Sequence, residues 1–315
     1  MALQITEVPL QALLIDAGRR RQQHLGATVS GPMDWFAFEV NRCLLRLPHK
    51  TTQIELHQGR FSAIVTSDTW ICAAGKEASL TINQQPSACL QAHRVKQGDV
   101  ITVESPTRIA YFALSGVIKC CFAYGSQSCV VREHAGGIDG SGSALAVGDE
   151  LHWQALKTSP NPLEPLKLGR LQQLCQQIYA KRSIGVTAGP QRNRFSRCEW
   201  LRFLTGEYAV SGQRSRMGYR ISGPLICASN YAMRSEPLIM GTIQVPADGQ
   251  PIVMMADHQT LGGYPKIAQI VRSDLPLVAQ SATNESISFT EVDPAIASFN
   301  YHRILNQLAE ITAPN

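Results

Sequence analysis

Residues 241–268 read GTIQVPADGQPIVMMADHQTLGGYPKIA and predict a β-hairpin that continues into a polar loop. Residues 243–245 have the character of a strand, and residues 251–255 supply the returning strand. Between them, Pro246 presets φ and Gly249 tolerates a positive φ, as a tight turn requires. The segment that follows, residues 257–265, is polar and rich in glycine, so it is unsuited to a core. Loops of this kind, carried on strands, often hold ligand-binding groups.

The predicted loop contains several groups that suit a binding or catalytic site. Asp257, Gln259 and Thr260 supply hydrogen-bond donors and acceptors. Gly262 and Gly263 let backbone N–H groups approach an anion or a carbonyl oxygen closely. On spacing alone, an ordinary polar loop with a glycine turn is the competing interpretation.

The rest of the chain predicts a mainly β fold with a few helices. Short apolar runs bounded by turn residues indicate strands, and their recurrence suggests barrels or sandwiches. These runs are residues 12–15, 52–56, 63–65, 79–82, 99–103, 109–112 and 184–187. Helices are predicted after the caps Asp34 and Ser196, over residues 168–178, and from Asp293 onward.

Two of these helices carry specific expectations about burial. In the first, Ala37, Val40, Asn41 and Leu44 share one face. In the last, the apolar residues expected to face inward are Ile296, Phe299, Ile304 and Leu308.

A proline-rich segment predicts the domain boundary. Residues 158–165 read TSPNPLEP, and three prolines in eight residues make a stiff connection. We therefore expect two β-rich halves, residues 1–157 and 166–315, joined by a linker over 158–165.

Composition narrows the classes of function. The chain of 315 residues is 44% hydrophobic and carries a net charge of +5, without the clustered basic face of a nucleic-acid-binding protein. Nine cysteines form no CxxC pair, so we expect buried structural thiols rather than a metal site or a disulfide framework. The sequence shows no signal peptide and no membrane-spanning run, and we expect a cytoplasmic protein that binds neither membrane nor nucleic acid.

Two further stretches are candidates for anion binding. Asp16, Gly18 and Arg19 precede the helix start at Asp34, and Asn41 lies on the apolar side of that helix. Free N–H groups at a helix start bind anions, although a cap with a structural amide explains the same residues. Residues 210–220 place three arginines among small residues, which suits either a carboxylate or phosphate site or a solvated basic strand edge.

Taken together, these motifs resemble the biotin-dependent carboxyltransferase-like family that includes KipA, the C subunit of 5-oxoprolinase and the carboxyltransferase part of urea carboxylase, also called allophanate hydrolase subunit 2. The family pattern is close to G-x-[IV]-Q-V-P-x-x-G-Q-P-I-x-L-x-x-D-x-Q-T-T-G-G-Y-P-[KR]-I. In this loop region the chain matches at Gln244, Val245, Pro246, Gly249, Gln250, Pro251, Asp257, Gln259, Thr260, Gly262, Gly263, Tyr264 and Pro265. Further matches outside it include Asp16, Gly18, Arg19, Asp34, Asn41, Glu55, Gly59, Gln213, Arg216 and Arg220.

The resemblance implies two cyclophilin-like β-barrel subdomains and a component of ATP-dependent 5-oxoprolinase, inactive alone. Its implied partners are a KipI-like B subunit and a LamB-like A subunit, and the implied reaction opens 5-oxo-L-proline to L-glutamate. ATP is then used at the level of the complex, and no metal is expected. The matched residues imply catalytic roles for Asp257, Gln259 and Thr260. The implied substrate-binding residues are Arg19, Asp34, Asn41, Arg216, Gln244, Gln250, Gly262, Gly263 and Tyr264.

Two other functions fit the same resemblance. One is a component of a biotin-dependent carboxyltransferase that acts on urea or a related amide, which needs a biotin carrier that this chain lacks. The other is a KipA-like regulator that binds a KipI-like kinase inhibitor.

Overall fold

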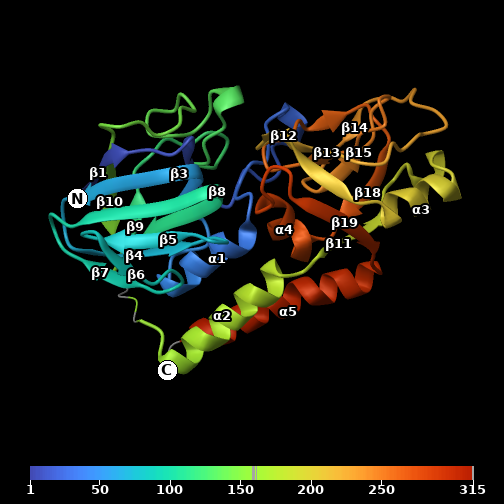
Figure 1. The fold of residues 1–315 in the computed structure, drawn as a ribbon. Helices are drawn as coiled ribbons and strands as arrows, with labels where there is room; N and C mark the ends of the chain where they lie inside the picture. The colour runs from blue at the N-terminus through green and yellow to red at the C-terminus, as the bar shows by residue number, and fades with distance from the viewer. Residues whose placement is uncertain (158–159, 161, 314–315) are drawn as a thin grey trace. The chain divides into compact units, whose positions relative to one another are not determined.

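A computed structural model describes residues 1–157, 160 and 162–313, and they form two compact units (Figure 1). Unit 1 comprises Met1–Arg20, Ser30–Gln176 and Gln307–Asn315, and unit 2 comprises Arg21–Val29 and Gln177–Asn306. Both units are therefore discontinuous in sequence. Part of the predicted linker, at positions 158, 159 and 161, lies outside the described residues.

Unit 1 is built on a branched ten-stranded sheet. Its main path runs β6-β5-β8-β3-β1-β10-β9, and β2, β4 and β7 pair beside it. These strands are β1 Ala2–Glu7, β2 Gln11–Ile15, β3 Gln53–Val65, β4 Thr69–Ala74, β5 Ser79–Ile82, β6 Gln85–Ser87, β7 His93–Val95, β8 Val100–Leu114, β9 Gly116–Ile118 and β10 Glu150–Ala155.

The apolar runs predicted as strands supply much of the core of unit 1. The long antiparallel pair β3–β8 places Phe61 opposite Val103, and the Phe61 and Phe112 rings lie 5.9 Å apart. Both rings are fully buried, as are Leu3, Ile54 and Ile101 in the same cluster. Helix α1, Trp35–Leu44, contributes the predicted apolar face, since Ala37, Val40, Asn41 and Leu44 are all buried.

Unit 2 contains a closed barrel of seven strands in the order β11-β18-β15-β16-β13-β12-β19. Its strands are β11 Ser183–Ala188, β12 Tyr208–Ser215, β13 Gly218–Ser222, β15 Thr242–Gln244, β16 Ile252–Met254, β18 Lys266–Ile270 and β19 Ser286–Glu291. A separate two-stranded ribbon pairs β14, Glu236–Pro237, with β17, Leu261–Gly262. The mainly β prediction is thus confirmed.

The predicted hairpin forms two neighbouring strands of this barrel, β15 and β16. Ile243 pairs with Val253 and Gln244 pairs with Ile252, and the Gly249 N–H donates to the Pro246 carbonyl at 3.0 Å to close the turn. An aromatic cluster packs beside the barrel strands, with Phe203 and Phe289 stacked at 4.7 Å. Phe203 lies on α3, Arg197–Thr205, which begins at the predicted cap Ser196.

Three other α-helices complete the described chain: α2 Pro165–Tyr179, α4 Leu275–Ala279 and α5 Pro294–Thr312. None of the helices formed by the described residues is both long and apolar enough to cross a membrane.

The inward face predicted for α5 is only half correct. Ile304 and Leu308 are buried, but Ile296 is 56% exposed and Phe299 is 67% exposed. At about 3.6 residues per turn, the nine residues from Phe299 to Leu308 span two and a half turns. The two residues therefore lie on opposite faces of the helix, and one face cannot bury both pairs.

The expectation that the cysteines are buried structural thiols is also wrong for part of the set. Cys72, Cys129 and Cys175 are buried, whereas Cys121, Cys198 and Cys227 are exposed. All nine are free thiols. Exposure follows position, because Cys198 lies in the first turn of α3 and Cys121 and Cys227 lie in loops, where the chain packs on one side only.

Candidate functional site

The predicted site residues divide between the two units. Arg19, Asp34 and Asn41 belong to unit 1. The remaining site residues, on the stretch 210–220, the hairpin and the loop that follows it, belong to unit 2. The two groups differ in how their polar atoms are used.

In unit 1, Asp34 is the N-cap of α1. Its Oδ1 accepts from the N–H groups of Phe36 and Ala37 at 3.0 and 3.1 Å. Its own N–H donates to the Tyr111 hydroxyl at 2.9 Å. The side chain is completely buried, so the carboxylate serves the helix start as the capping prediction describes.

Asn41 ties α1 to the sheet. Its Nδ2 donates to the Tyr111 carbonyl at 3.1 Å and to Gln53 Oε1 at 3.2 Å, and Gln53 Nε2 returns to the Phe38 carbonyl at 2.9 Å. These contacts match the structural-amide alternative that the sequence left open. The buried Asn41 Oδ1 has no hydrogen-bond partner among the described residues, and the substrate-binding role of Asn41 stays a prediction.

Arg19 is also enclosed. The side chain is 1% exposed, and its guanidinium donates to the backbone carbonyls of Ala123, at 3.0 Å, and Ser128. Asp16 binds the same segment, accepting from the hydroxyls of Ser126 and Ser128 at 2.6 and 2.7 Å. Asp16 and Arg19 thus fasten the loop at residues 123–128 to the end of β2.

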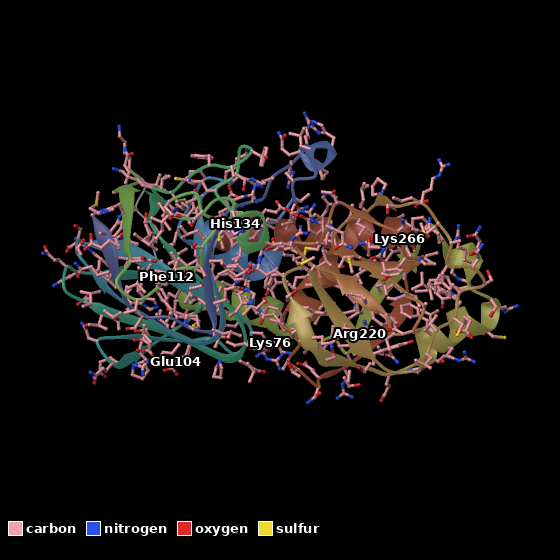
Figure 2. The ribbon with its side chains drawn as sticks, turned by 90° about the horizontal axis from the view of Figure 1, so that it is seen from above. Lys76, Glu104, Phe112, His134, Arg220 and Lys266 are labelled. Atoms are coloured by element: carbon pink, nitrogen blue, oxygen red, sulfur yellow. The ribbon has the colours of Figure 1, made fainter. Side chains whose placement is uncertain are left out.

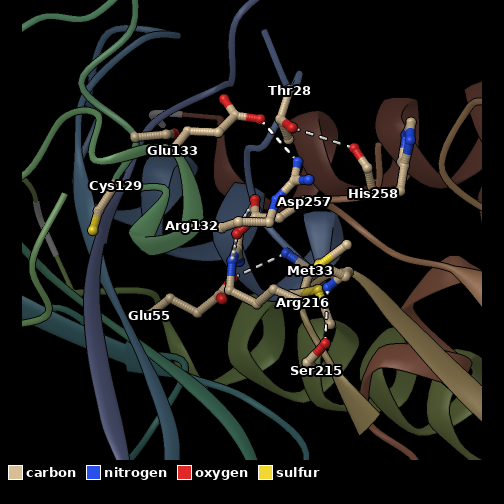
Figure 3. A network of polar contacts seen from close by, with 12 residues as sticks. Thr28, Met33, Glu55, Cys129, Arg132, Glu133, Ser215, Arg216, Asp257 and His258 are labelled. Atoms are coloured by element: carbon tan, nitrogen blue, oxygen red, sulfur yellow. Dashed lines mark hydrogen bonds and ion pairs between the residues drawn. The ribbon is translucent and has the colours of Figure 1, made fainter. Parts of the chain in front are cut away.

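Unit 1 also contains a buried hydrogen-bond network, centred on Glu55, that the sequence did not predict. Glu55 is completely buried, and its Oε2 accepts from the Met33 N–H at 2.9 Å (Figure 3). The same Oε2 accepts from the Tyr111 hydroxyl, and Oε1 contacts His57 Nε2 at 2.7 Å. Burial and the neighbouring carboxylates of Glu55 and Asp34 raise the pKa of Tyr111 well above its ordinary value, so the phenol stays a donor. Glu55 had only a motif match, and its partner lies 56 residues away in the sequence.

In unit 2, Arg216 and Asp257 form a buried, two-pronged ion pair (Figure 3). Arg216 Nε donates to Asp257 Oδ2 and Nη2 donates to Oδ1, both at 2.8 Å. Side-chain exposure is 5% for the arginine and 9% for the aspartate. The Asp257 N–H also donates to the Arg216 carbonyl at 2.7 Å, so backbone and side chains fix the same pair.

This pairing sharpens the roles predicted for the two residues. Both Asp257 oxygens bind one planar guanidinium, an arrangement that holds each side chain in a single orientation. The geometry fits the orienting role proposed for Asp257, since each of its two carboxylate oxygens accepts a hydrogen bond from Arg216. Its role as a base stays a prediction.

A side chain from strand β15, Gln244, binds the backbone of the loop that follows Asp257. Gln244 Nε2 donates to the Tyr264 carbonyl at 3.2 Å. A Cβ added at Gly262 would lie 2.6 Å from Gln244 Nε2 and 2.7 Å from Leu238 Cδ1. Glycine is therefore needed at 262 for space, so that Gln244 passes beneath the loop.

The upper side of the same loop faces outward. Gln259 and Thr260 are half-buried, and Tyr264 is 48% exposed. His258 lies between Asp257 and Gln259 and is buried; its Nδ1 contacts the Gln259 carbonyl at 2.7 Å. Its own carbonyl accepts from the Thr28 hydroxyl at 3.3 Å. Buried side chains thus hold the loop in place, while Gln259, Thr260 and Tyr264 remain accessible to solvent. This combination suits a binding surface.

Gln250 does not join this group. Its side chain accepts from the Gly223 N–H at 3.1 Å and donates to the Gly223 carbonyl at 3.3 Å. It precedes β16, whereas Asp257 follows β16, so the two residues lie at opposite ends of that strand. The motif match alone did not distinguish a residue that binds a neighbouring backbone segment, as Gln250 does, from one that lies in the site.

The sequence analysis also missed Lys266, which begins β18 directly after the loop. Lys266 is 2% exposed, and its Nζ contacts Glu236 Oε2 at 2.7 Å. The hydrogen bond and charge of Lys266 lower the pKa of Glu236. The bracketed [KR] of the family pattern, after Tyr264 and Pro265, marked this position.

Comparison with known proteins identifies the family. The carboxyltransferase domain family, subdomains A and B, matches residues 25–291. The chain belongs to this family.

Relatives and a solved structure extend the comparison. The chain is 29% identical over 296 residues to the C subunit of 5-oxoprolinase from Escherichia coli K12, and the match covers 92% of this chain and 91% of that protein. It is 27% identical over 293 residues to the C subunit of 5-oxoprolinase from Haemophilus influenzae, with the same coverage. The fold resembles that of the K. lactis urea amidolyase, with a TM-score of 0.89 at 20% identity over the whole chain. This chain spans only 20% of that much longer protein.

Proposed function

We propose that this member of the carboxyltransferase domain family is the C subunit of an ATP-dependent 5-oxoprolinase. The observation that carries the proposal is the similarity to two 5-oxoprolinase C subunits along 91% of their length. In the proposed complex, a KipI-like B subunit and a LamB-like A subunit complete the enzyme. We infer that the chain takes part in turnover only within that complex.

The chemistry explains why such a complex would need preset polar groups. A lactam carbonyl is a weak electrophile, and opening its ring adds water across the C–N bond to give a carboxylate and an amine. Coupling to ATP hydrolysis, with phosphorylation of the carbonyl oxygen, makes that carbon attackable. The charge that develops needs donors that are already oriented.

The loop of unit 2 supplies groups of this kind. Arg216 is oriented by Asp257 through two hydrogen bonds of 2.8 Å. Gln259, Thr260 and Gly263 are partly exposed along the same loop, and Gly262 between them is buried. We assign Arg216 to binding a substrate carboxylate or phosphate and Asp257 to holding it in place, with the remaining groups lining the pocket.

A biotin-dependent carboxyltransferase acting on urea or a related amide is the second candidate. The fold similarity to urea amidolyase favours it. That function would require a biotin carrier supplied by another chain. The two candidates differ in their required cofactors, which makes them separable by experiment.

The test is reconstitution of the complex. The chain is mixed with its two partner subunits, 5-oxo-L-proline and ATP, and glutamate is measured, with each protein omitted in turn. We expect ATP-dependent glutamate formation that disappears when this chain is left out. A stable complex that forms no glutamate would sink the oxoprolinase proposal, and carboxylation that depends on a biotinylated carrier would establish the alternative.

A matched pair of variants tests the site within that assay. Asp257→Asn keeps the size of the side chain but removes the charge that holds Arg216. Asp248→Asn is the control, because Asp248 also pairs with an arginine, Arg220, but is 51% exposed in the hairpin turn. We expect a loss of glutamate formation of at least about 100-fold for the first variant and little change for the second. Full activity of Asp257→Asn would remove Asp257 from the site.

A further inference from the structure

Two buried donors in unit 2 converge on one oxygen atom. Lys266 Nζ lies 2.7 Å from Glu236 Oε2, and Gln191 Nε2 donates to the same Oε2 at 2.8 Å. Figure 2 shows Lys266 within unit 2. This convergence is separate from the Arg216–Asp257 pair, which uses neither donor.

The donors are fixed to the barrel, whereas the acceptor is not. Lys266 and Gln191 are 2% and 9% exposed. They also bind each other through the backbone, since the Gln191 N–H donates to the Lys266 carbonyl at 3.3 Å and the Lys266 N–H donates to Gln191 Oε1 at 3.4 Å. Glu236 has a side chain that is 45% exposed and lies on the two-residue strand β14.

This arrangement has the geometry of a site for an anionic oxygen. Two preset donors at 2.7–2.8 Å from one oxygen match the spacing by which enzymes stabilise an oxyanion. A buried ammonium requires an anion nearby, but it does not require that the anion belong to the same chain. Because Glu236 is half exposed, its carboxylate regains water easily when another anion replaces it.

We propose that Lys266 Nζ and Gln191 Nε2 form a binding site for the carboxylate of a small-molecule ligand, which Glu236 fills in this structure as an internal competitor. The inference rests on the proposed function in one respect only, the choice of ligand: in 5-oxoprolinase the carboxylate would be that of 5-oxo-L-proline, and Arg216 would then bind the phosphate. The donors themselves are defined by the geometry of this chain.

Displacement of Glu236 would reach the candidate loop through the backbone. Glu236 pairs with Gly262 in the β14–β17 ribbon, and the Leu238 N–H donates to the Thr260 carbonyl at 3.0 Å. A ligand that replaces the Glu236 carboxylate therefore removes the side-chain bonds by which this ribbon is held to Lys266 and Gln191. Carboxylate binding would thus act on the ribbon that contains Gly262.

The test measures ligand binding to the full chain alone by titration calorimetry. The probe is 5-oxo-L-proline, and the matched probe is 5-oxo-L-prolinamide, which lacks the carboxylate. Since an internal competitor acts at a high effective concentration, Glu236→Ala is expected to bind 5-oxo-L-proline at least about 10-fold more tightly than the unsubstituted chain. The prolinamide should show no such gain. Adding Lys266→Met to Glu236→Ala should abolish the gain.

Two more variants keep the result interpretable. Glu236→Gln retains the shape of the side chain and tests the same release if Glu236→Ala fails to fold. Asp248→Asn removes a different exposed carboxylate of unit 2, one that pairs with Arg220, and should leave affinity unchanged.

Equal affinity with and without Glu236, or a gain that survives Lys266→Met, would overturn the proposal. Because neither partner subunits nor ATP are present, this outcome is distinguishable from failure of the reconstituted complex to make glutamate.

Discussion

The two units use their motif residues in opposite ways. In unit 1, Asp34 and Asn41 are completely buried and bind only the chain itself, joining α1 to the sheet through Tyr111. In unit 2, a buried pair, Arg216 and Asp257, supports a loop whose upper residues are accessible. A motif match therefore identifies residues that the fold or the site requires. Burial then distinguishes residues that hold the structure together from residues that a ligand can reach.

The largest expected effect comes from breaking the Arg216–Asp257 pair. Arg216→Met leaves a buried carboxylate without its counterion and should lower the free energy of unfolding by about 3–5 kcal/mol. Combining it with Asp257→Leu removes the stranded charge and should recover most of that loss without restoring activity. Urea denaturation and the glutamate assay measure the two quantities. Recovery of activity in the double variant would contradict a site in unit 2.

The buried hydrogen-bond network of unit 1 should affect stability alone. Tyr111→Phe removes the donor to Glu55 and the acceptor for the Asp34 N–H, and should cost about 1–3 kcal/mol. Tyr208→Phe is the matched control, because the buried Tyr208 hydroxyl has no hydrogen-bond partner among the described residues. Thermal unfolding should show a clear loss for the first and almost none for the second. A changed KM for Tyr111→Phe would place a ligand near this network.

A smaller effect is expected at the helix cap. Asp34→Ala removes the acceptor for two N–H groups of α1 and should lower stability by about 1 kcal/mol. Asp34→Asn keeps an acceptor oxygen and should recover most of it. Full stability with lost turnover for Asp34→Ala would instead support the substrate-binding role that the resemblance implied.

The smallest effect depends on pH. The pKa of Glu236 is lowered, chiefly by its hydrogen bond to Lys266, from an ordinary value of 4.5. A lowered folded-state pKa contributes stability above the unfolded pKa and loses it as pH falls through the folded value. The unsubstituted chain should therefore exceed Glu236→Gln in stability at about pH 6–7, and the difference should vanish in more acidic solution. A difference that grows below pH 4.5 would show that Lys266 does not set this titration.

Local sequence signals predicted local structure well. The turn at Pro246 and Gly249 and the cap at Asp34 follow from neighbours a few residues apart. The strand boundaries were predicted less well, because β3 joins the predicted runs 52–56 and 63–65 and β8 joins 99–103 and 109–112. The capping box at Ser196 is only half formed: Ser196 accepts from the Glu199 N–H, but the Glu199 carboxylate binds Arg202 and the Cys227 N–H instead. Tertiary partners outweighed the local one.

The parts of the site that escaped prediction all depend on distant partners. Lys266 and Gln191 lie 75 residues apart, and Lys266 and Glu236 lie 30 apart. A single sequence carries no signal for such convergence. Nor could the sequence reveal that the Gln250 side chain binds the backbone of Gly223. A side-chain amide that binds the backbone and one that binds a ligand are the same residue type, and only their partners distinguish them.

The discontinuity of the units affects the order in which the protein can fold during synthesis. Residues 307–313, at the end of α5, belong to unit 1, although the long segment Gln177–Asn306 of unit 2 separates them from the rest of it. A domain whose segments are contiguous can finish folding while the ribosome is still translating the next one. Unit 1 must instead wait for the last turns of α5 to emerge, so a nascent chain stalled before residue 307 should expose the surface against which Leu308 and Ile311 are buried.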